Sequence, residues 1–406
     1  MEATSPAYEA TRRRSSRGRG APTLGRRRTA VYARCRLGRE MAKLRVGLLF
    51  GGRSVEHEVS VTSATCILKA LDKARYDVSL VAIDHAGRWH LGSPALPPEA
   101  ATGGEEVTLP AIPGQHSLVS MSRGPRDVAR ALEPLDVIFP IIHGQGGEDG
   151  TLQGLLELAG VPYVGAGVLG SALQMDKEAS KRLLAAAGLP VVPWVLIRRE
   201  ELRAGAEAAA QRAVAALGLP VFVKPANLGS SVGISKVKER GELVPALFEA
   251  ARYDHKLLVE RAVDAREIEV ALLGNDPIEA SVAGEIRTRR EWYDYEAKYV
   301  DDDTELLIPA PIDAAQSRAA REMAIEAVRV LEGAGLARVD FLMDRHTGEL
   351  FVNEVNSLPG FTQGSMYPRL WEASGLPYAA LLDRLIELAL ARHREKQELE
   401  TVYRRV

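Results

Sequence analysis

Cysteine is scarce in this chain, since only Cys35 and Cys66 occur among its 406 residues. Neither has a metal-ligand spacing or an obvious disulfide partner, which argues against a secreted, disulfide-stapled fold and fits a reducing compartment. Long hydrophobic runs are missing as well. No stretch of 18 or more apolar residues occurs, so the sequence excludes a transmembrane helix.

A strong excess of one charge is also lacking, because the formal net charge is only −2. This balance hides an asymmetry: residues 1–40 carry eleven arginines against three glutamates, which leaves the remainder mildly acidic. An acidic body does not suggest a nucleic-acid binder. The arginine-rich segment is typical of a solvated tail, or of sequence upstream of a true start at Met41. A transit peptide and a nucleic-acid-binding arm are the alternatives.

The length predicts two or three domains, and 46% hydrophobic with 26% charged residues is typical of a globular protein. Apolar runs at 44–50 and 76–83 predict strands, and the spacing over 59–71 predicts a helix between them. Strands that alternate with helices indicate a parallel sheet, whose ligands bind beyond the carboxyl ends of the strands. Two glycine-rich loops, 51–60 and 143–150, follow such strands.

Three less regular segments follow. Residues 92–126 are rich in Gly, Pro and Ser and are predicted to form a surface excursion, and 288–308 a polar loop. Residues 225–233 form a small-residue loop between two strands, directly after Lys224. Backbone N–H groups in such a loop approach an anion closely and the lysine adds charge, as in a phosphate clamp. The pattern is neither GxxxxGK[ST] nor GxGxxG, so an ordinary hairpin loop stays an alternative.

A pair of strands near the C-terminus carries four polar residues among Val, Phe, Leu and Met. Arg338 and Asp340 share one strand face, and Glu354 and Asn356 share one face of the next strand. A hairpin centred on Thr347 places Asp340 opposite Glu354 and Arg338 opposite Asn356. Two facing carboxylates repel unless a cation lies between them, and these oxygen donors suit Mg²⁺. The alternative is a partly exposed hairpin with solvated charges.

Two further segments are candidates for substrate contact. Residues 293–299 combine three charged residues with three tyrosines, and predict either a functional lid or a decorated surface loop. Glu56 lies at a predicted helix start, where N–H groups can hold an anion while the carboxylate receives an ammonium group. Together these features would suit an amino-acid zwitterion.

Seven blocks between residues 44 and 370 resemble, in the same order, the motif series of the D-alanine–D-alanine ligases of the ATP-grasp superfamily. Residues 1–40 have no counterpart in that series. Seven blocks in register are far more specific than any one of them. The blocks are 51–60, 143–150, 223–225, 229–233, 293–299, 338–340 and 353–360.

The resemblance implies binding sites for ATP and for two Mg²⁺ or Mn²⁺ ions. For ATP, the resemblance implies that Lys177 and Lys224 contact the phosphates and that Ser231 lies in the loop that closes over them. It also implies that Glu260 to Val263 form the adenine-side linker and that Glu267 holds the ribose. The implied metal ligands are Asp340, Glu354 and Asn356.

The resemblance also implies residues for the two amino acids. Glu56 would bind the ammonium group of the first, connected through Ser230 and Tyr299. The implied oxyanion groups are Arg338 and the Gly360 N–H. The remaining implied substrate residues are His143, Lys298, Ser365 and Met366.

An α/β protein of three-domain ATP-grasp architecture is therefore expected, with an N-terminal parallel-sheet domain. The expected boundaries are 1–43 for a basic tail, 44–165 for substrate binding, and 166–263 and 264–406 for the two ATP-grasp domains. The implied activity forms D-alanyl-D-alanine through a D-alanyl phosphate, for peptidoglycan precursors. The alternatives are a D-lactate or D-serine acceptor and a non-catalytic nucleotide-binding protein. The implied location is cytoplasmic, with D-alanine and ATP as partners, no nucleic acid or membrane, and a homodimer allowed.

Overall fold

A computed structural model describes residues 42–92, 103–121, 131–288 and 304–400. By its internal contacts the chain divides after Ala42, and every helix and strand below belongs to the unit that starts at Lys43. Within the described ranges, no helix is long and apolar enough to cross a membrane.

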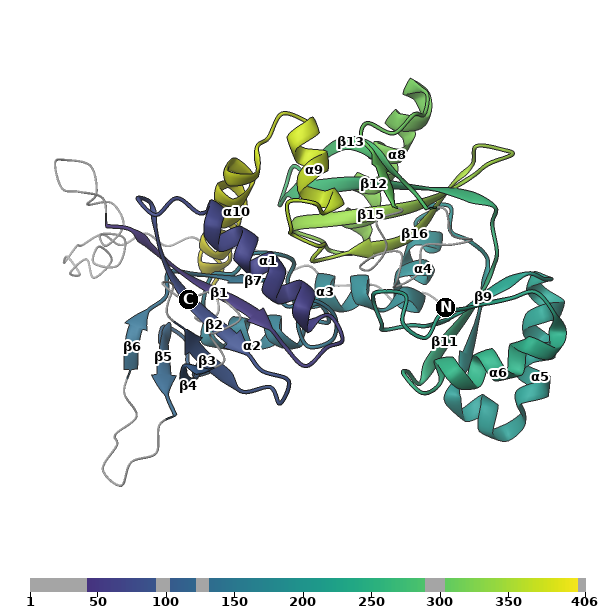
Figure 1. The fold of residues 1–406 in the computed structure, drawn as a ribbon, viewed down its shortest axis with the longest axis horizontal. Coiled ribbons are helices and arrows are strands. Elements are labelled where there is room, and N and C mark those ends of the chain that lie inside the picture. Colours follow the sequence, from purple (N-terminus) through teal and green to yellow (C-terminus); the bar gives the residue numbers. More distant parts are fainter. Residues whose placement is uncertain (1–41, 93–102, 122–130, 289–303, 401–406) are drawn as a thin grey trace, which may run out of the picture. The chain divides into compact units, whose positions relative to one another are not determined.

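The first sheet has seven strands in the order β6-β5-β4-β3-β2-β1-β7 (Figure 1). β1 pairs in parallel with β2 and β7, which confirms the predicted parallel unit, and the other pairs are antiparallel. The strands are β1 (Leu44–Gly51), β2 (Tyr76–Ile83), β3 (Trp89–Gly92), β4 (Glu105–Thr108), β5 (Ser117–Ser120), β6 (Ala131–Pro134) and β7 (Val137–Pro140). The helices of this part are α1 (His57–Ala70) and α2 (Thr151–Ala159).

The prediction that 92–126 is a surface excursion was wrong for β4 and β5, which extend the sheet. Each of these strands is four residues long and buries one apolar side chain, Val107 or Leu118. Such a strand is too short to show a clear alternation, and the surrounding Gly, Pro and Ser hide it. The N-terminal sheet is therefore mixed, and its parallel part is confined to β1, β2 and β7.

The second sheet has four antiparallel strands in the order β10-β9-β11-β8. The predicted hairpin after Lys224 is confirmed, because β10 pairs with β9. Helices α5 and α6 cover one face of this sheet (Figure 1) and share a buried core with it. The elements are β8 (Trp194–Arg198), β9 (Val221–Pro225), β10 (Ser235–Val237), β11 (Lys256–Arg261), α5 (Arg199–Leu217) and α6 (Arg240–Ala250). The helices that precede it are α3 (Val168–Met175) and α4 (Lys177–Ala186).

The third sheet is antiparallel, with five strands in the order β14-β13-β12-β15-β16. β14 lies inside 288–308, where the sequence predicts only a polar loop, and its burial is slight enough to explain the error. The strands are β12 (Ala265–Gly274), β13 (Glu279–Arg287), β14 (Glu305–Leu307), β15 (Gly335–Asp344) and β16 (Leu350–Asn356). The helices that follow or join them are α8 (Ala314–Val330), α9 (Met366–Ala373) and α10 (Tyr378–Gln397).

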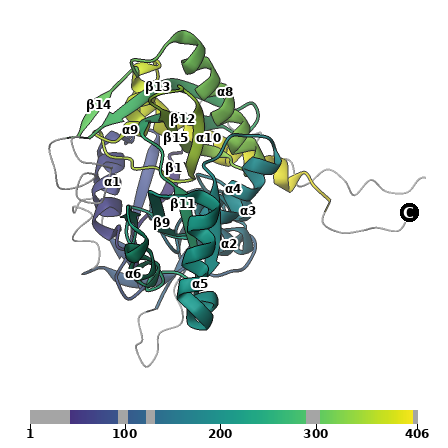
Figure 2. The ribbon, with the colours of Figure 1, turned by 90° about the vertical axis from the view of Figure 1, so that its right-hand side faces the viewer.

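β12 shows why this sheet is covered on both faces. Ile268 and Val270 point into a core with α8, whereas Ala271 and Leu273 point into a core with α9 and α10. Figure 2 shows α8 and α9 on opposite sides of the sheet. Apolar side chains on both faces make a strand continuously buried, and the charged residues in it are therefore exceptional.

Candidate active site

Two cavities of similar size lie among these sheets. The first has a volume of about 620 Å³ and is lined from the start of α1 and the 143–150 loop, from β12 and β15, and from the segment after β16. The second, of about 600 Å³, lies between the second and third sheets. Lys177, Ser230 and Glu354 line both cavities, so the two volumes meet at these side chains.

Glu56 lies where α1 begins, as predicted, and its side chain is buried. The Ser230 hydroxyl donates a hydrogen bond to its carboxylate, which joins the loop after β9 to the N-terminal sheet. A Cβ at Gly144 would lie 2.7 Å from the Glu56 carboxylate, and one at Gly229 would lie 3.1 Å from it. Both loops reach Glu56 because these two positions have no side chain, and Gly144 also has a φ of +75°.

His143 is buried in the larger cavity with a defined tautomer. Its Nδ1 lies 3.1 Å from the Leu358 carbonyl oxygen and its Nε2 lies 3.4 Å from the Ser63 hydroxyl. A carbonyl only accepts, so Nδ1 carries the proton and Nε2 accepts from Ser63. Burial lowers the pKa of His143, which keeps the imidazole neutral.

Glu148 is a half-buried carboxyl group in the same region, and the sequence reasoning did not assign it. It accepts hydrogen bonds from the backbone N–H groups of Gly144 at 2.6 Å and Leu358 at 3.2 Å. Burial, and then the neighbouring Glu56, raises the pKa of Glu148 to about 8. The group is therefore largely protonated at neutral pH, and it ties the 143–150 loop to the segment after β16.

The β15–β16 hairpin has the predicted register at its polar end. Arg338 pairs with Asn356 and Asp340 with Glu354, which confirms the expected facing carboxylates. The register then shifts at Phe341, which pairs with Val352, so one residue of β16 bulges out beside the site. Bulges are common next to active sites because they redirect side chains.

Arg338 makes a two-pronged ion pair with Asp340, with both N···O distances 2.7 Å. Its Nε also lies 2.9 Å from the buried Glu269 carboxylate. Burial would lower the pKa of Arg338, but the carboxylates of Asp340 and Glu269 outweigh burial and hold it well above its ordinary value. The Asn356 amide donates to Asp340 at 2.9 Å, so this network orients the Asp340 carboxylate.

Lys177 connects the two cavities through its ammonium group. It donates to the Leu228 carbonyl at 2.8 Å and lies 3.1 Å from the Glu354 carboxylate. Its position is set by α4, whose first turn is capped by Asp176, which accepts from the Ala179 N–H. A cation at this point faces both the loop after β9 and the β16 carboxylate.

Three charged side chains, Lys181, Lys224 and Glu260, form a cluster at the smaller cavity. Glu260 is buried between Lys181 at 3.1 Å and Lys224 at 2.7 Å. Burial would raise the pKa of Glu260, but the two lysines outweigh it and lower that pKa to about 2. Burial lowers the pKa of Lys181, whereas Glu260 raises that of Lys224 in spite of burial. Of the two lysines, Lys224 therefore holds its charge more firmly.

The loop between β9 and β10 has an unusual backbone. Ser230 and Ser231 have φ values of 51° and 58°, in the left-handed region that non-glycine residues seldom adopt. Two consecutive residues in this region turn the backbone sharply over the smaller cavity, which both serines line. Because such strain persists only where the surroundings hold it, it marks a functional loop.

The structure brings most of the other predicted residues to the same two cavities. Val263 and Glu267 line the smaller one, whereas Gly360, Ser365 and Met366 line the larger one. The Ser365 hydroxyl lies 2.8 Å from the Thr362 hydroxyl. Ser365 directly precedes α9, whose first residue is Met366. Lys298 and Tyr299 lie outside the described residues.

Three charged residues that lie at or next to the site were missed in the sequence. Lys181 lies one helical turn after Lys177, and Glu269 lies two residues after Glu267 on an otherwise apolar strand. Both spacings place the second residue on the face of the first, which was the available signal. Glu148 lies in the glycine-rich 143–150 loop, where its acidic neighbour Asp149 makes it look like a solvated charge.

Two family sequence profiles match this chain. One is described as D-ala D-ala ligase N-terminus and matches residues 45–166, and the other as D-ala D-ala ligase C-terminus and matches residues 183–387. Among curated relatives, the D-alanine–D-alanine ligase of Heliobacterium modesticaldum is 50% identical over 364 residues, covering 89% of this chain and 98% of that protein.

Solved structures of the same kind are similar in fold. The D-alanine–D-alanine ligase of Coxiella burnetii has a TM-score of 0.77 and 38% identity, covering 88% of this chain and 96% of its own. The VanG D-Ala:D-Ser ligase of Enterococcus faecalis has a TM-score of 0.76 and 33% identity, covering 86% and 99%.

Proposed function

Because the chain belongs to the D-alanine–D-alanine ligase family, we propose that it joins two D-alanine molecules in a reaction driven by ATP. The observation that carries this proposal is the meeting of two cavities at Lys177, Ser230 and Glu354. One cavity suits the nucleotide and the other the two amino acids. The γ-phosphoryl group of ATP can therefore reach a carboxylate in the second volume.

The smaller cavity has the groups that a nucleotide triphosphate requires. Lys177 and Lys224 supply positive charge for the phosphates, and the loop with Ser230 and Ser231 turns its backbone over the same volume. The Glu260 side chain is fully engaged by Lys181 and Lys224. We therefore assign Glu260 to the orientation of Lys224, and its backbone to the adenine side.

The β15–β16 residues fit divalent cations. Asp340 and Glu354 face each other across the hairpin, Asn356 lies beside them, and all three offer hard oxygen atoms of the kind that bind Mg²⁺ or Mn²⁺. These residues would hold two ions, which would offset charge on the phosphates and on the leaving group. Arg338 and the Asn356 amide meanwhile orient Asp340, and Lys177 orients Glu354.

The chemistry needs activation because a carboxylate is a poor acyl donor. Phosphoryl transfer to the first D-alanine gives an acyl phosphate, which the amine of the second attacks with release of inorganic phosphate. Arg338 and the Gly360 N–H line the larger cavity, where they can stabilise the tetrahedral oxyanion. Closure of the Ser230 loop on Glu56 excludes water, which would otherwise hydrolyse the acyl phosphate.

Glu56 gives the first amino acid its orientation. A buried carboxylate at the start of α1 attracts an ammonium group, whereas the neutral His143 adds no competing positive charge. Ser365 and Met366, at the start of α9, would meet the carboxylate of the second amino acid. Tyr299 and Lys298 are proposed from the sequence alone as lid residues.

The acceptor has one specific alternative, because the similar VanG structure is described as a D-Ala:D-Ser ligase. Purified protein should therefore be incubated with ATP, Mg²⁺ and D-alanine, alone or with D-serine or D-lactate, and L-alanine should be tested separately. Mass spectrometry should show D-alanyl-D-alanine with ADP, and little ester from pH 6 to 9. Predominant D-alanyl-D-lactate or D-alanyl-D-serine would overturn the acceptor, and no ADP-coupled product would overturn the ligase function.

The same experiment tests the lid. Tyr299→Phe should lower dipeptide synthesis with little change in the KM for ATP, because Lys177, Lys224 and Ser231 lie on the phosphate side. We also propose that the three sheets are the cores of three domains with boundaries near residues 165 and 263. A cytoplasmic location, where ATP is available, and the absence of nucleic-acid or membrane partners belong to the same proposal.

A further inference from the structure

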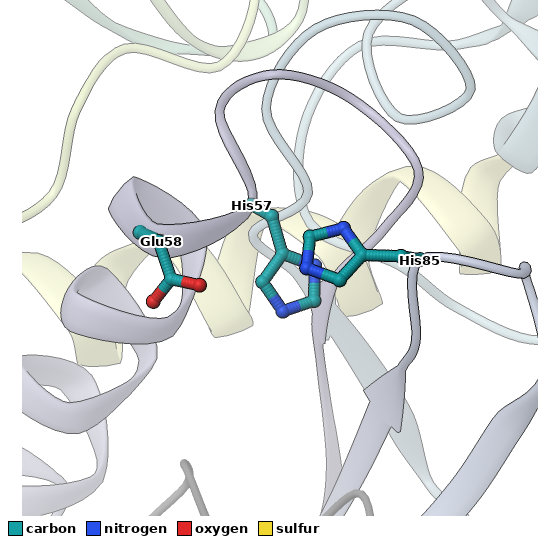
Figure 3. A group of neighbouring side chains, drawn as sticks. All are labelled: His57, Glu58 and His85. Carbon is teal, nitrogen blue, oxygen red and sulfur yellow. The ribbon is translucent and has the colours of Figure 1, made fainter.

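A cluster of metal-ligating side chains lies outside the residues used above. We propose that His57, Glu58 and His85 form a binding site for a single Zn²⁺ ion. Their ligand atoms all lie within 4.8 Å of one another. Figure 3 shows the His85 ring stacked on that of His57, with the Glu58 carboxylate beside them.

His57 is the fixed ligand of this site. It is the first residue of α1, its side chain is buried, and its Nδ1 lies 2.8 Å from the Gly52 carbonyl oxygen. Since a carbonyl only accepts, Nδ1 carries the proton and Nε2 keeps its lone pair for a metal. A backbone carbonyl that orients the second nitrogen is the usual outer support of a metal-binding histidine.

His85 is presented by a turn that its neighbour holds in place. The Asp84 carboxylate accepts from the backbone N–H groups of Ala86 and Arg88, each at 2.9 Å. The His85 ring stacks on His57 with 4.0 Å between centroids and 28° between planes. The turn after β2 therefore keeps the second imidazole beside the first; His85 lines neither cavity described above, whereas Glu58 lines the larger one.

The geometry requires only a small closure of exposed side chains. Tetrahedral zinc with metal–ligand distances near 2.0–2.2 Å holds its ligand atoms about 3.3 Å apart, closer than the 4.8 Å limit seen here. Glu58 and His85 are exposed, so rotation about their side-chain bonds can bring them to the ion while His57 stays fixed. Two imidazoles and one carboxylate, completed by water, are a common zinc donor set.

Mg²⁺ cannot replace zinc here, because Mg²⁺ prefers oxygen ligands throughout. The site is therefore chemically distinct from Asp340 and Glu354, and it does not depend on the proposed ligase function. Zinc would link the first turn of α1 to the turn after β2, and should stabilise the folded protein in proportion to its occupancy.

The test is a titration of tag-free protein with ZnCl₂ in excess Mg²⁺, followed by isothermal calorimetry and by thermal unfolding. We compare the wild type with His85→Ala and Glu58→Gln. The matched control is His346→Ala, which removes an exposed histidine from the turn between β15 and β16. Binding to other groups of the chain is common to all four proteins and cancels in the comparison.

The wild type and His346→Ala should bind one more zinc equivalent than His85→Ala, or bind it at least tenfold more tightly. Glu58→Gln should fall between them, and zinc should raise the Tm of the wild type more than that of His85→Ala. Equal zinc stoichiometry and affinity in the wild type and His85→Ala would overturn the site. Ligase turnover without zinc should be the same in those two proteins, so failure of this site leaves the proposed function untouched.

Discussion

Two hairpins face the smaller cavity, and they are built differently. β15 and β16 pair through six residue pairs, and β15 also pairs along its whole length with β12. β9 and β10 pair through only three residue pairs, and β10 is the edge of its sheet. Backbone with few ladder bonds opens more easily than a strand in the centre of a sheet.

This difference separates a fixed support from a closing loop. The β15–β16 hairpin holds Asp340 and Glu354, the proposed cation ligands, opposite each other. The β9–β10 hairpin carries Ser230 and Ser231 in a strained turn that contacts Glu56 at the start of α1. The longer pairing of β15 with β16 therefore holds its side chains in fixed positions, whereas the shorter pairing of β9 with β10 lets the loop between them open and close.

The largest effect is expected on the fixed hairpin. Glu354→Gln keeps the size of the side chain but removes a charge that faces Asp340, so turnover should fall by at least about 100-fold. The fold should survive, with only a loss of the contact to Lys177. Glu349→Gln, an exposed position in the same hairpin, is the matched control. Near-normal ADP release at ordinary Mg²⁺ concentration would show that Glu354 is not a metal ligand.

The cluster of Lys181, Glu260 and Lys224, which lies at strand β9 of the closing hairpin, should contribute to the stability of the protein. Lys181→Met leaves Glu260 buried with one cation instead of two, and should lower the free energy of unfolding by roughly 3 kcal/mol. Urea unfolding measures this change, with the exposed Lys238→Met as control. If both variants unfold like the wild type, Lys224 alone satisfies Glu260 and the cluster does not anchor β9.

The stability of the protein should depend on pH through Glu148, which ties the 143–150 loop to the segment after β16. The pKa of Glu148 is about 8 in the folded protein against an ordinary 4.5. As the pH rises, Glu148 therefore loses its proton in the unfolded chain before it does so in the folded protein. Stability should therefore fall as pH rises from 4.5 to about 8, and level off above. Glu148→Gln cannot ionise, so its stability relative to the wild type should rise by more than about 1 kcal/mol between pH 5 and 8. Parallel stability curves for the two proteins over this range would contradict a protonated Glu148.

A smaller effect is expected in the strained turn. Ser231→Gly relieves a left-handed conformation that costs a non-glycine residue about 1–2 kcal/mol, but it also frees the unfolded chain. The net stabilisation should be at most about 1 kcal/mol in chemical unfolding. Ser231→Ala removes the same hydroxyl and keeps the strain, so it should gain nothing. Equal stability of the glycine and alanine variants would mean that the turn is not strained.

The smallest effect is expected outside both hairpins. Removal of residues 1–40 should leave the Tm and the ligase turnover unchanged, because their sequence lacks the pattern of a packed element. Differential scanning calorimetry and an ADP-release assay on the two lengths give the comparison. A drop of several degrees in Tm would show that this segment packs on the rest of the chain.

Sequence patterns predicted the fixed hairpin better than the rest of the site. Alternation along β15 and β16, with a turn between them, was sufficient to pair Asp340 with Glu354. The bulge at the Phe341 pair was not predicted, because an extra residue in one strand leaves the local alternation almost unchanged. β4 and β5 were missed since a four-residue strand with one buried side chain has no readable period.

Buried charges were the other gap. Lys181 lies one helical turn after Lys177 on α4, but only the tertiary structure shows that Glu260 and the Trp194 ring lie beside it. The partner of a buried charge lies far away in sequence, so spacing alone cannot identify it. Lys224 was found because a loop of small residues follows it directly, which is a local signal.

Both backbone polar groups of Leu358 form hydrogen bonds with the 143–150 loop. Its carbonyl accepts from His143 and its N–H donates to Glu148, more than 200 residues earlier in the chain. Separation of these segments would break both bonds together, whereas the Ser230–Glu56 contact comes from a short hairpin. The Leu358 side of the larger cavity should therefore open less often than its Ser230 side.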